Sequence, residues 1–201
     1  MEDIRHGHRT VYETHARRWD RERSRRLFEK PWLDRLLQHV PAGGDVLDLG
    51  CGAGEPIARY LIEQGRRVTG IDFAAGMLDL ARSRFPGEIW IAGDMRALDL
   101  GRRFSGIVAW NSSFHLSRNE QRQLLPRLGR HLLPGGALLM TVGPAEGEAL
   151  GHVGDGTVYH ASLSPAEFEE RLAAAGLLVE SFVANDLACA GHSVVLARMT
   201  A

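Results

Sequence analysis

The sequence predicts an α/β domain built on a doubly wound, mostly parallel sheet with helices on both faces. Short apolar runs alternate with helix-like segments between residues 46 and 142. The first apolar run passes directly into the loop Gly50-Cys51-Gly52-Ala53-Gly54, and helix-like sequence follows. This order of strand, glycine turn and helix brings a nucleotide-like ligand close to bare backbone. The length of 201 residues fits one domain with a sizeable core.

Five short apolar runs are predicted to form the parallel part of the sheet. We place these strands at residues 46–49, 68–71, 89–92, 106–110 and 137–142. Helices are expected between them, at residues 55–64, around 77–81 and at 117–131. The last of these helices has a clear start signal, because Ser117-Arg118-Asn119-Glu120 has the capping-box pattern. The alternation of short apolar strands with helices indicates a parallel, doubly wound sheet.

The last third of the chain has a different pattern. Residues 144–156 are rich in glycine and acidic residues, and we expect an irregular loop there. Ser164-Pro165-Ala166-Glu167 supplies an N-cap, a proline at the first helical position and a reciprocal glutamate. A helix is therefore predicted from that point to Gly176, a good residue for a helix C-terminus. Residues 177–184 and 193–197 are expected to form an antiparallel pair of strands that closes the sheet.

The N-terminal region is rich in arginine and carries apolar residues at roughly helical spacing. We expect one or two amphipathic helices that end near His39. Acidic residues are interleaved with the arginines, which favours a solvated helix face over a nucleic-acid-binding arm. Tyr12 and Trp19 lie seven positions apart and would share one helix face. That face either packs on the body of the domain or covers a ligand.

Composition excludes several classes of partner. The net charge of -1 gives no general attraction to nucleic acid or anionic lipid. The charged N-terminus does not resemble a signal peptide, and no apolar run approaches the ~18 residues that cross a bilayer. Cys51 and Cys189 suggest no disulfide framework and form no metal-ligand spacing with the histidines. We therefore expect a cytoplasmic protein without a metal, either a monomer or a homodimer.

Three acidic residues occupy positions that suit a nucleoside ligand. Asp48 lies inside the first strand. Asp72 ends the second strand about 20 residues beyond the glycine loop, where an acid accepts hydrogen bonds from ribose hydroxyls. Asp94 ends the third strand and is placed to accept from an exocyclic amine. Each residue alone is also explained as a strand-end cap, but the three together favour a ligand site.

With these motifs the chain resembles the class I S-adenosylmethionine-dependent methyltransferases of the small-molecule type. The resemblance extends from Tyr12 through the last strand, and its carrying segments are VLDLGCGAG at 46–54, GIDFAAGML at 70–78, GDM at 93–95 and LPGG at 133–136. It implies a three-layer fold with a seven-stranded sheet whose last strand is antiparallel. It also implies one domain, 1–201, with an N-terminal helical lid at 1–40, a cofactor-binding core at 41–142, and an acceptor-side loop, helix and closing strand pair at 143–201.

The resemblance implies S-adenosylmethionine as cofactor and S-adenosylhomocysteine as its product. The glycine loop would meet the methionine part, and Asp72 would hold the ribose hydroxyls. Asp94 would accept from the adenine amine, Met95 N–H would donate to a ring nitrogen, and the Trp110 main chain would face the ammonium group. The expected cofactor-binding residues are Tyr12, Trp19, Asp48, Gly50, Cys51, Gly52, Gly54, Asp72, Phe73, Met77, Asp94, Met95, Trp110 and Asn111.

The glycine spacing separates this cofactor from NAD, which the same type of fold also binds. The loop follows G-x-G-x-G and not the dinucleotide pattern G-x-G-x-x-G. Glu55 also lies where a pyrophosphate would approach, and an acid there would repel it. A sulfonium ligand without phosphate tolerates that charge.

The acceptor side should lie beyond the carboxyl ends of the strands. His115 follows the fourth strand, where many members of the resembled family also carry a histidine, and its pKa range suits a catalytic base. The more ordinary roles of such a histidine are a helix cap or packing. The other pocket candidates are Tyr159, His160, Cys189 and His192. Tyr159 and His160 are equally explained as strand residues under a loop, and Cys189 as a small buried hydrophobe.

The segment Asn111-Ser112-Ser113-Phe114 lacks the Asn/Asp-Pro-Pro-aromatic motif of amino-methylating nucleic-acid enzymes. No Pro-Cys pair offers a nucleophile for cytosine methylation. These absences and the near-neutral charge disfavour a nucleic-acid acceptor. We expect methyl transfer to oxygen, nitrogen or another nucleophilic atom of a small molecule. The alternatives are a non-catalytic protein that binds S-adenosylmethionine or S-adenosylhomocysteine, and a methyltransferase that acts on tRNA or protein.

Overall fold

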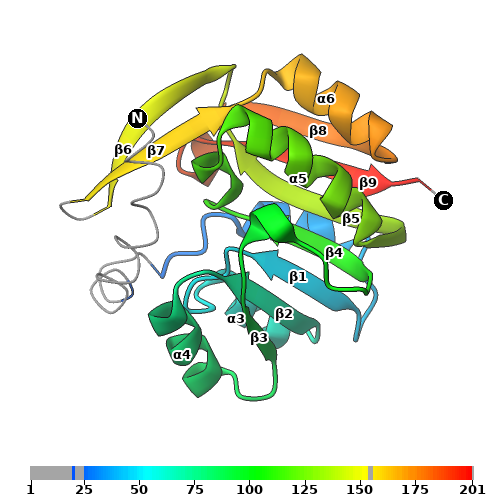
Figure 1. Cartoon of the computed structure of the whole chain (residues 1–201). Helices are drawn as coiled ribbons and strands as arrows, with labels where there is room; N and C mark the ends of the chain where they lie inside the picture. Colours follow the sequence, from blue (N-terminus) through cyan, green and yellow to red (C-terminus); the bar gives the residue numbers. More distant parts are fainter. Residues whose placement is uncertain (1–19, 21–24, 154–155, 201) are drawn as a thin grey trace.

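Seven strands form one sheet in the order β3-β2-β1-β4-β5-β9-β8 (Figure 1). The structure is a computed structural model that describes residue 20 and residues 25–153 and 156–200. The strands of the sheet are β1 (Asp45–Leu49), β2 (Arg67–Asp72), β3 (Ile89–Ala92), β4 (Phe104–Ala109), β5 (Leu132–Val142), β8 (Leu177–Asp186) and β9 (His192–Met199). The first five strands pair in parallel, and β9 lies antiparallel between β5 and β8. The prediction of a mostly parallel seven-stranded sheet with an antiparallel last strand is therefore confirmed.

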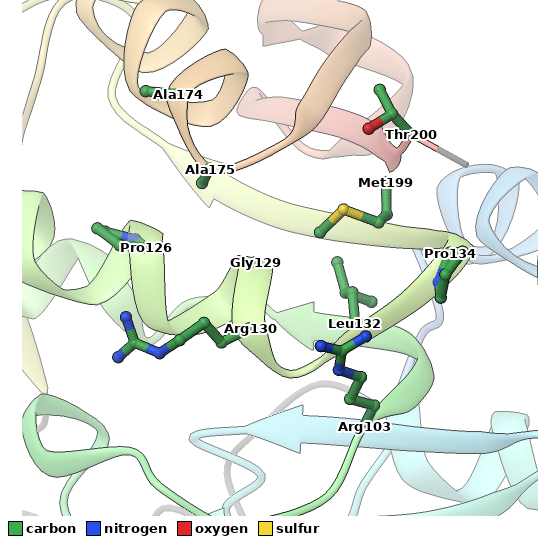
Figure 2. Close-up of a pocket in the computed structure, with 10 residues that line it drawn as sticks. All are labelled: Arg103, Pro126, Gly129, Arg130, Leu132, Pro134, Ala174, Ala175, Met199 and Thr200. Atoms are coloured by element: carbon green, nitrogen blue, oxygen red, sulfur yellow. The ribbon is translucent and has the colours of Figure 1, made fainter.

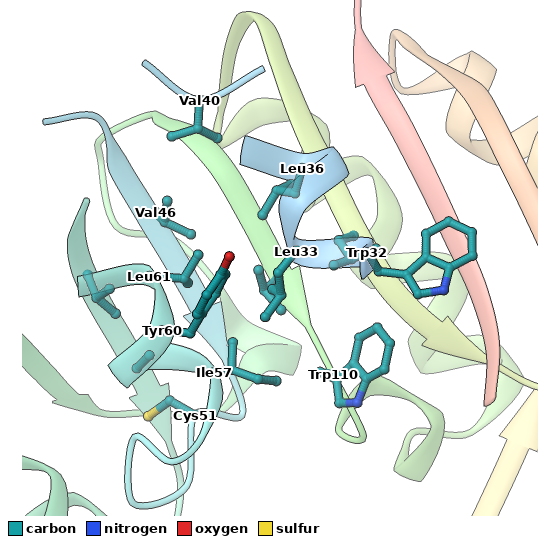
Figure 3. Packing of buried hydrophobic residues seen from close by; sticks show 14 of the residues in the cluster. Trp32, Leu33, Leu36, Val40, Val46, Cys51, Ile57, Tyr60, Leu61 and Trp110 are labelled. Atoms are coloured by element: carbon teal, nitrogen blue, oxygen red, sulfur yellow. The ribbon is translucent and has the colours of Figure 1, made fainter. Parts of the chain in front are cut away.

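Helices cover both faces of this sheet, as predicted for a three-layer fold (Figure 1). The helices are α2 (Lys30–Leu37), α3 (Ile57–Glu63), α4 (Ala75–Arg84), α5 (Arg118–Arg130) and α6 (Pro165–Ala174), with short 3₁₀ turns η1 (Met95–Ala97), η2 (Ser113–His115) and η3 (Leu187–Cys189). Alternate residues of β1 serve the two layers, because side chains along a strand point to opposite faces. Val46 packs with α2 and α3, whereas Leu47 and Leu49 pack with α5 and α6. Figure 3 shows the first of these two cores.

Strand β1 lies between β2 and β4. From β1 the sheet is built outward through β2 and β3 on one side, and through β4 and β5 on the other. Such a switch point opens a crevice beyond the carboxyl ends of the strands, where ligands bind in open α/β sheets. The carboxyl end of β1 leads directly into the glycine loop. The topology therefore places the loop at the edge of the sheet where the sequence predicted the site.

The expected irregular loop at residues 144–156 is wrong. Strands β6 (Gly147–Val153) and β7 (Gly156–Ser162) form a separate two-stranded antiparallel sheet (Figure 1). Seven residue pairs join the two strands, from Gly147↔Ser162 to Val153↔Gly156. Residues 147–150 are all exposed, so no alternation of apolar and polar positions marks β6 in the sequence. Strand β6 forms because it pairs with β7, and this pairing is not visible in the residues of β6 alone.

Two element boundaries also differ from prediction. Helix α3 begins at Ile57 and not at Glu55, because Pro56 holds the N-cap position. Strand β5 begins at Leu132 and not at Ala137, because Leu132 pairs with Phe104 of β4. Among the described residues, no helix is long and apolar enough to cross a membrane. Of the expected N-terminal helical region, Asp20 and residues 25–39 are described, and they include α2; Tyr12 and Trp19 lie outside the described residues.

Both predicted helix starts are confirmed, with one difference in detail. At α5 the Ser117 hydroxyl accepts from Glu120 N, and the Glu120 carboxylate returns a bond to Ser117 N, which completes the capping box. At α6 the Ser164 hydroxyl accepts from Glu167 N. The Glu167 carboxylate does not reciprocate, and binds Arg122 of α5 at 2.7 Å and Arg171 at 2.6 Å. Glu167 thus links the two helices that cover one face of the sheet.

Replacing Glu167 with glutamine should lower the free energy of unfolding by about 1 kcal/mol, the scale of partly exposed ion pairs. Arg122 and Arg171 lower the pKa of Glu167 to about 2, from an ordinary value of 4.5. A folded-state pKa below the unfolded value means that the stabilisation is present above pH 4.5 and is lost as the pH falls toward 2. Urea unfolding at pH 6 and pH 3 measures this difference.

The matched control is Glu169→Gln, because Glu169 is exposed on the same helix and has no ion pair among the described residues. It should change stability little at either pH. An equal difference between Glu167→Gln and the wild type at the two pH values would contradict a charge-based role for Glu167.

Candidate active site

The glycine loop is built so that its backbone stays bare. Gly50 N and Cys51 N donate to Ile71 O at 2.8 and 3.1 Å, which holds the loop against the end of β2. Gly50, Gly52 and Gly54 have φ values of 81°, 53° and 76°, in the left-handed region that favours glycine. A Cβ on Gly50 would lie 2.3 Å from Ser112 Cβ. Any other residue there would displace either the loop or the turn that follows β4.

Asp72 fastens this loop from the neighbouring strand. Its Oδ2 accepts from Gly52 N at 2.9 Å, and its Oδ1 accepts from Ala74 N at 2.8 Å. Burial raises the pKa of Asp72, and the backbone N–H groups act in the opposite direction by favouring the charged form. One carboxylate therefore connects the glycine loop to the turn that begins α4. It stands where the sequence placed a ribose-binding acid.

The side chain of Cys51 points into the core, away from any ligand (Figure 3). Burial raises the pKa of this thiol well above its ordinary value, and the carboxylates of Asp48 and Asp72 raise it further. Asp48 is itself buried within β1. Cys51 can therefore meet a cofactor only through its backbone.

Two predicted cofactor residues pack between the loop and α4. Met77 is almost completely buried against Ala53 and Ala74, and Phe73 packs at the edge of this small cluster. The cluster holds the first turn of α4 against the glycine loop. It adds an apolar contact to the hydrogen bonds that Asp72 makes there.

Asp94 and Met95 follow β3 at the same edge. The Asp94 carboxylate accepts from Arg96 N at 2.9 Å and forms an ion pair with the Arg96 guanidinium at 2.5 Å. Arg96 also reaches Glu120 at 3.1 Å. The methyl group of Met95 lies 3.5 Å from the point where a Gly50 Cβ would be. Met95 therefore lies beside the glycine loop. The pairing of Asp94 with Arg96 was not predicted from the sequence.

Two arginines reduce the repulsion that Glu55 would exert on a phosphate. Glu55 is buried and pairs with Arg59 at 2.5 Å and with Arg25 at 3.7 Å. These cations offset its negative charge, so the distinction from NAD depends on the glycine spacing. Next to this pair, Arg84 binds Asp20 at 2.5 Å and donates to Ala53 O at 3.3 Å. Asp20 is thereby held beside the glycine loop.

The turn after β4 is fixed by two hydrogen bonds to neighbouring strands. Asn111 N donates to Thr141 Oγ1 of β5 at 2.8 Å, and Asn111 has a φ of 49°. The Ser112 hydroxyl donates to Leu49 O at 2.6 Å. Trp110 is buried in the core beside Trp32 (Figure 3), so only its main chain is placed to face a ligand. Ser112 is a structural residue of the site that the sequence analysis did not single out.

The acceptor-side candidates form two groups. In the first, His115 Nδ1 lies 3.0 Å from the Tyr159 carbonyl oxygen. A carbonyl oxygen only accepts, so Nδ1 carries the proton and the lone pair of the neutral ring is on Nε2. The rings of His115, Phe114 and His160 gather within 5.0 Å of one another, measured between centroids. The Tyr159 side chain is almost completely buried, so Tyr159 contributes chiefly through its carbonyl.

The second group surrounds η3. His192 Nδ1 donates to Cys189 O at 2.7 Å, and the His192 ring lies 5.5 Å from the Trp110 ring. Burial raises the pKa of the Cys189 thiol to about 11, with the carboxylates of Glu29 and Asp186 adding to the effect. Cys189 is therefore a poor nucleophile. It packs as a small buried residue, the alternative given for it above.

A cavity of about 480 Å³ lies at the opposite edge of the sheet (Figure 2). It is formed at the start of β5, the end of β9 and the last turns of α5 and α6; its lining includes Arg103, Arg130, Leu132 and Met199. None of the predicted site residues lines it. The cavity is thus separate from the glycine loop.

Part of the chain is similar in sequence to known methyltransferases. Residues 46–136 match the model of a family described as a methyltransferase domain. A dTDP-3-amino-3,6-dideoxy-alpha-D-glucopyranose N,N-dimethyltransferase of Streptomyces fradiae is 37% identical over 107 residues, which cover 52% of this chain and 42% of the relative. A trans-aconitate 2-methyltransferase of Paracidovorax citrulli is 36% identical over 126 residues, covering 61% and 46%. The chain spans about half the length of the curated relatives it matches.

Solved structures extend the likeness of fold to nearly the whole chain. The CcbJ methyltransferase from Streptomyces caelestis matches with a TM-score of 0.75 at 19% identity, covering 96% of this chain and 98% of that one. CalS10 from Micromonospora echinaspora, an amino pentose methyltransferase solved with S-adenosylmethionine bound, matches with a TM-score of 0.70 at 25% identity, covering 94% and 97%. The segment 46–136 contains the glycine loop, Asp72 and the turn after β4. Over residues 46–136 the chain is therefore similar in sequence to a methyltransferase domain, and nearly its whole length is similar in fold to S-adenosylmethionine-dependent methyltransferases.

Proposed function

We propose that this chain transfers the methyl group of S-adenosylmethionine to a nucleophilic atom, oxygen or nitrogen in particular, of a small molecule. The observation that carries the proposal is the bare glycine loop fastened to the Asp72 carboxylate at the switch point of the sheet. The loop leaves no room for a Cβ at Gly50, so its backbone is accessible to a ligand that lies against the main chain.

The residues present fit this cofactor. The Asp72 carboxylate accepts from Gly52 N and Ala74 N and would also accept from a ribose hydroxyl. Asp94 binds Arg96 through both of its oxygens and would share its carboxylate between Arg96 and the adenine amine. Phe73 and Met95 offer apolar surface beside these acids. When bound, the cofactor supplies a methyl group already activated on a sulfonium.

The chain's own part in the reaction is to hold the acceptor and to take its proton. Because the methyl group is already activated, in-line placement of the acceptor atom supplies most of the catalysis. The glycine loop, Asp72 and Asp94 would hold the cofactor, whose sulfonium would supply the methyl group to the acceptor atom. His115 Nε2 then receives the proton of the acceptor, since Nδ1 already donates to Tyr159 O.

We further propose that residues 1–40 form a lid over this site. The support is the ion pair between Asp20 and Arg84, together with the bond from Arg84 to Ala53 O. These contacts hold Asp20 beside the loop that would bind the cofactor. We place the protein in the cytoplasm, since both cysteines are free thiols.

The function is tested by incubating the full chain with S-adenosylmethionine labelled in the methyl group and a metabolite extract. Label in small molecules is the expected result. Label in protein or tRNA would replace the proposed acceptor class, whereas binding of S-adenosylhomocysteine without any transfer would reduce the chain to a cofactor-binding protein.

Asp72→Ala should weaken binding of S-adenosylhomocysteine by ~1–3 kcal/mol, the scale of a lost hydrogen bond to a charged group. The variant also releases Gly52 N, so part of the loss comes from a looser loop. Calorimetry measures the affinity, with Asp79→Ala as control, because Asp79 is exposed on α4 and pairs only with Arg82 among the described residues. Equal affinities in the wild type and Asp72→Ala would make Asp72 a strand cap.

Gly50→Ala should lower the cofactor affinity at least tenfold, because the new methyl group would meet Ser112 and the residue would keep a φ that costs about 1–2 kcal/mol. Gly65→Ala is the matched control. Gly65 has a similar φ of 74°, but nothing lies within 4 Å of its Cβ position. Gly65→Ala should lose some stability and keep the cofactor affinity. Wild-type affinity in Gly50→Ala together with a loss of affinity in Gly65→Ala would show that the glycine loop is not the binding element.

A further inference from the structure

His160 lies in a space that the neighbouring strand leaves for it. A Cβ on Gly151 of β6 would lie 2.7 Å from His160 Cε1, 3.2 Å from Nε2 and 3.3 Å from Nδ1. The imidazole therefore lies flat over the Gly151 backbone, in a place that any other residue at position 151 would obstruct. The half-buried ring is held against β6.

Away from Gly151, the His160 imidazole contacts the rings of His115, the candidate base, and Phe114. The His160 and His115 ring centroids are 5.0 Å apart, and Phe114 meets both rings edge-on at 4.7 and 4.8 Å. The residue before His160 in β7 supplies the carbonyl that accepts from His115 Nδ1. Strand β7 thus contacts His115 twice, through the Tyr159 carbonyl and through the His160 ring.

We propose that His160 is a positioning residue that, seated on Gly151, holds His115 in the orientation and uncharged state of a general base. The proposal rests on the proposed function, in which His115 Nε2 receives the acceptor proton. After transfer, that proton is on Nε2 and leaves to water once the methylated product has gone. No oxidant or further reactant is needed.

Two physical effects support this role. The His160 and Phe114 rings pack against His115 and restrict how its ring can turn about the bond to the Tyr159 carbonyl. Burial also lowers the pKa of His160, so His160 remains uncharged near neutral pH. An uncharged aromatic neighbour replaces water beside His115, and loss of that water disfavours a charged imidazolium.

Among the described residues, the remaining titratable groups around His115 do not compete for this role. Turn η2 packs on β5 and β7, and β5 contains no titratable residue. On β7 the titratable groups are Tyr159 and His160, and on the paired strand β6 they are Glu148 and His152. Glu148 pairs with Arg118 of α5, which also binds Glu146.

The test uses the full chain with ¹⁵N-labelled histidine, and long-range ¹H–¹⁵N spectra that report tautomer and titration for each ring. In the wild type, His115 should be a single Nδ1-protonated tautomer. In His160→Asn the tautomers should mix, and the titration midpoint of His115 should rise by about half a pH unit or more as water reaches the ring. His152→Asn is the control, because His152 is exposed on β6, and it should leave the His115 signals unchanged.

Gly151→Ala provides a second variant that displaces the His160 ring without removing it, and it should change the His115 signals in the same direction. It also decides the matter if His160→Asn does not fold. Unchanged tautomer and midpoint of His115 in the folded variants would overturn the positioning role.

Activity separates this inference from the function beneath it. With an acceptor in hand, His160→Asn should lower kcat about tenfold or more, keep the KM for the cofactor, and shift the acid limb of kcat/KM to higher pH. A wild-type chain with the expected His115 spectra but no methyl transfer would overturn the function and leave the ring arrangement standing. Full transfer with unchanged pH profiles in both variants would overturn the role of His160.

Discussion

The carboxylate of Asp72 is the constraint on which the geometry of the cofactor side depends. Through two backbone N–H groups it connects the loop that leaves β1 with the turn that starts α4. These segments meet because β1 and β2 are parallel and in register, with Leu49 opposite Ile71. Ile71 O accepts from the first two N–H groups of the loop, so the strand end and the carboxylate act on the same few residues. The loop is therefore fixed before any ligand arrives, which reduces the ordering cost of binding.

Most of the cofactor side could be predicted because its determinants are local. Glycine at a positive φ, a serine before a helix and an acid at a strand end each act within a few residues. The complete capping box at Ser117 and Glu120 is an example. Where a second element intervenes, prediction fails by a few residues. Strand β5 begins early because of its pairing with Phe104, which no feature near Leu132 indicates.

The acceptor side was less predictable because it is made by contacts between distant segments. Strand β6 has exposed side chains at 147–150 and exists through pairing with β7, so its composition resembled that of a loop. The proton position on His115 depends on a carbonyl 44 residues away. In the sequence His115 and His160 are separate candidates, and only the fold shows that their rings pack together, with the His160 ring against Gly151. The two partners of Glu55 show the same difference between local and distant contacts. The pair with Arg59 is four residues apart and follows from helical spacing, whereas the pair with Arg25 joins distant segments.

This division has a chemical reason. The same activated methyl group serves every acceptor, so the donor site has one task and can be built largely from main chain and a few acids. The acceptor atom must instead be placed in line with that methyl group, and small displacements are costly. Such placement needs side chains held by several elements at once, as His115 is held by η2 and β7, and His160 by β7 and β6. In this chain the β6–β7 hairpin is the element that brings such side chains together, because β7 carries His160 and the carbonyl that binds His115, and β6 leaves room for the His160 ring at Gly151.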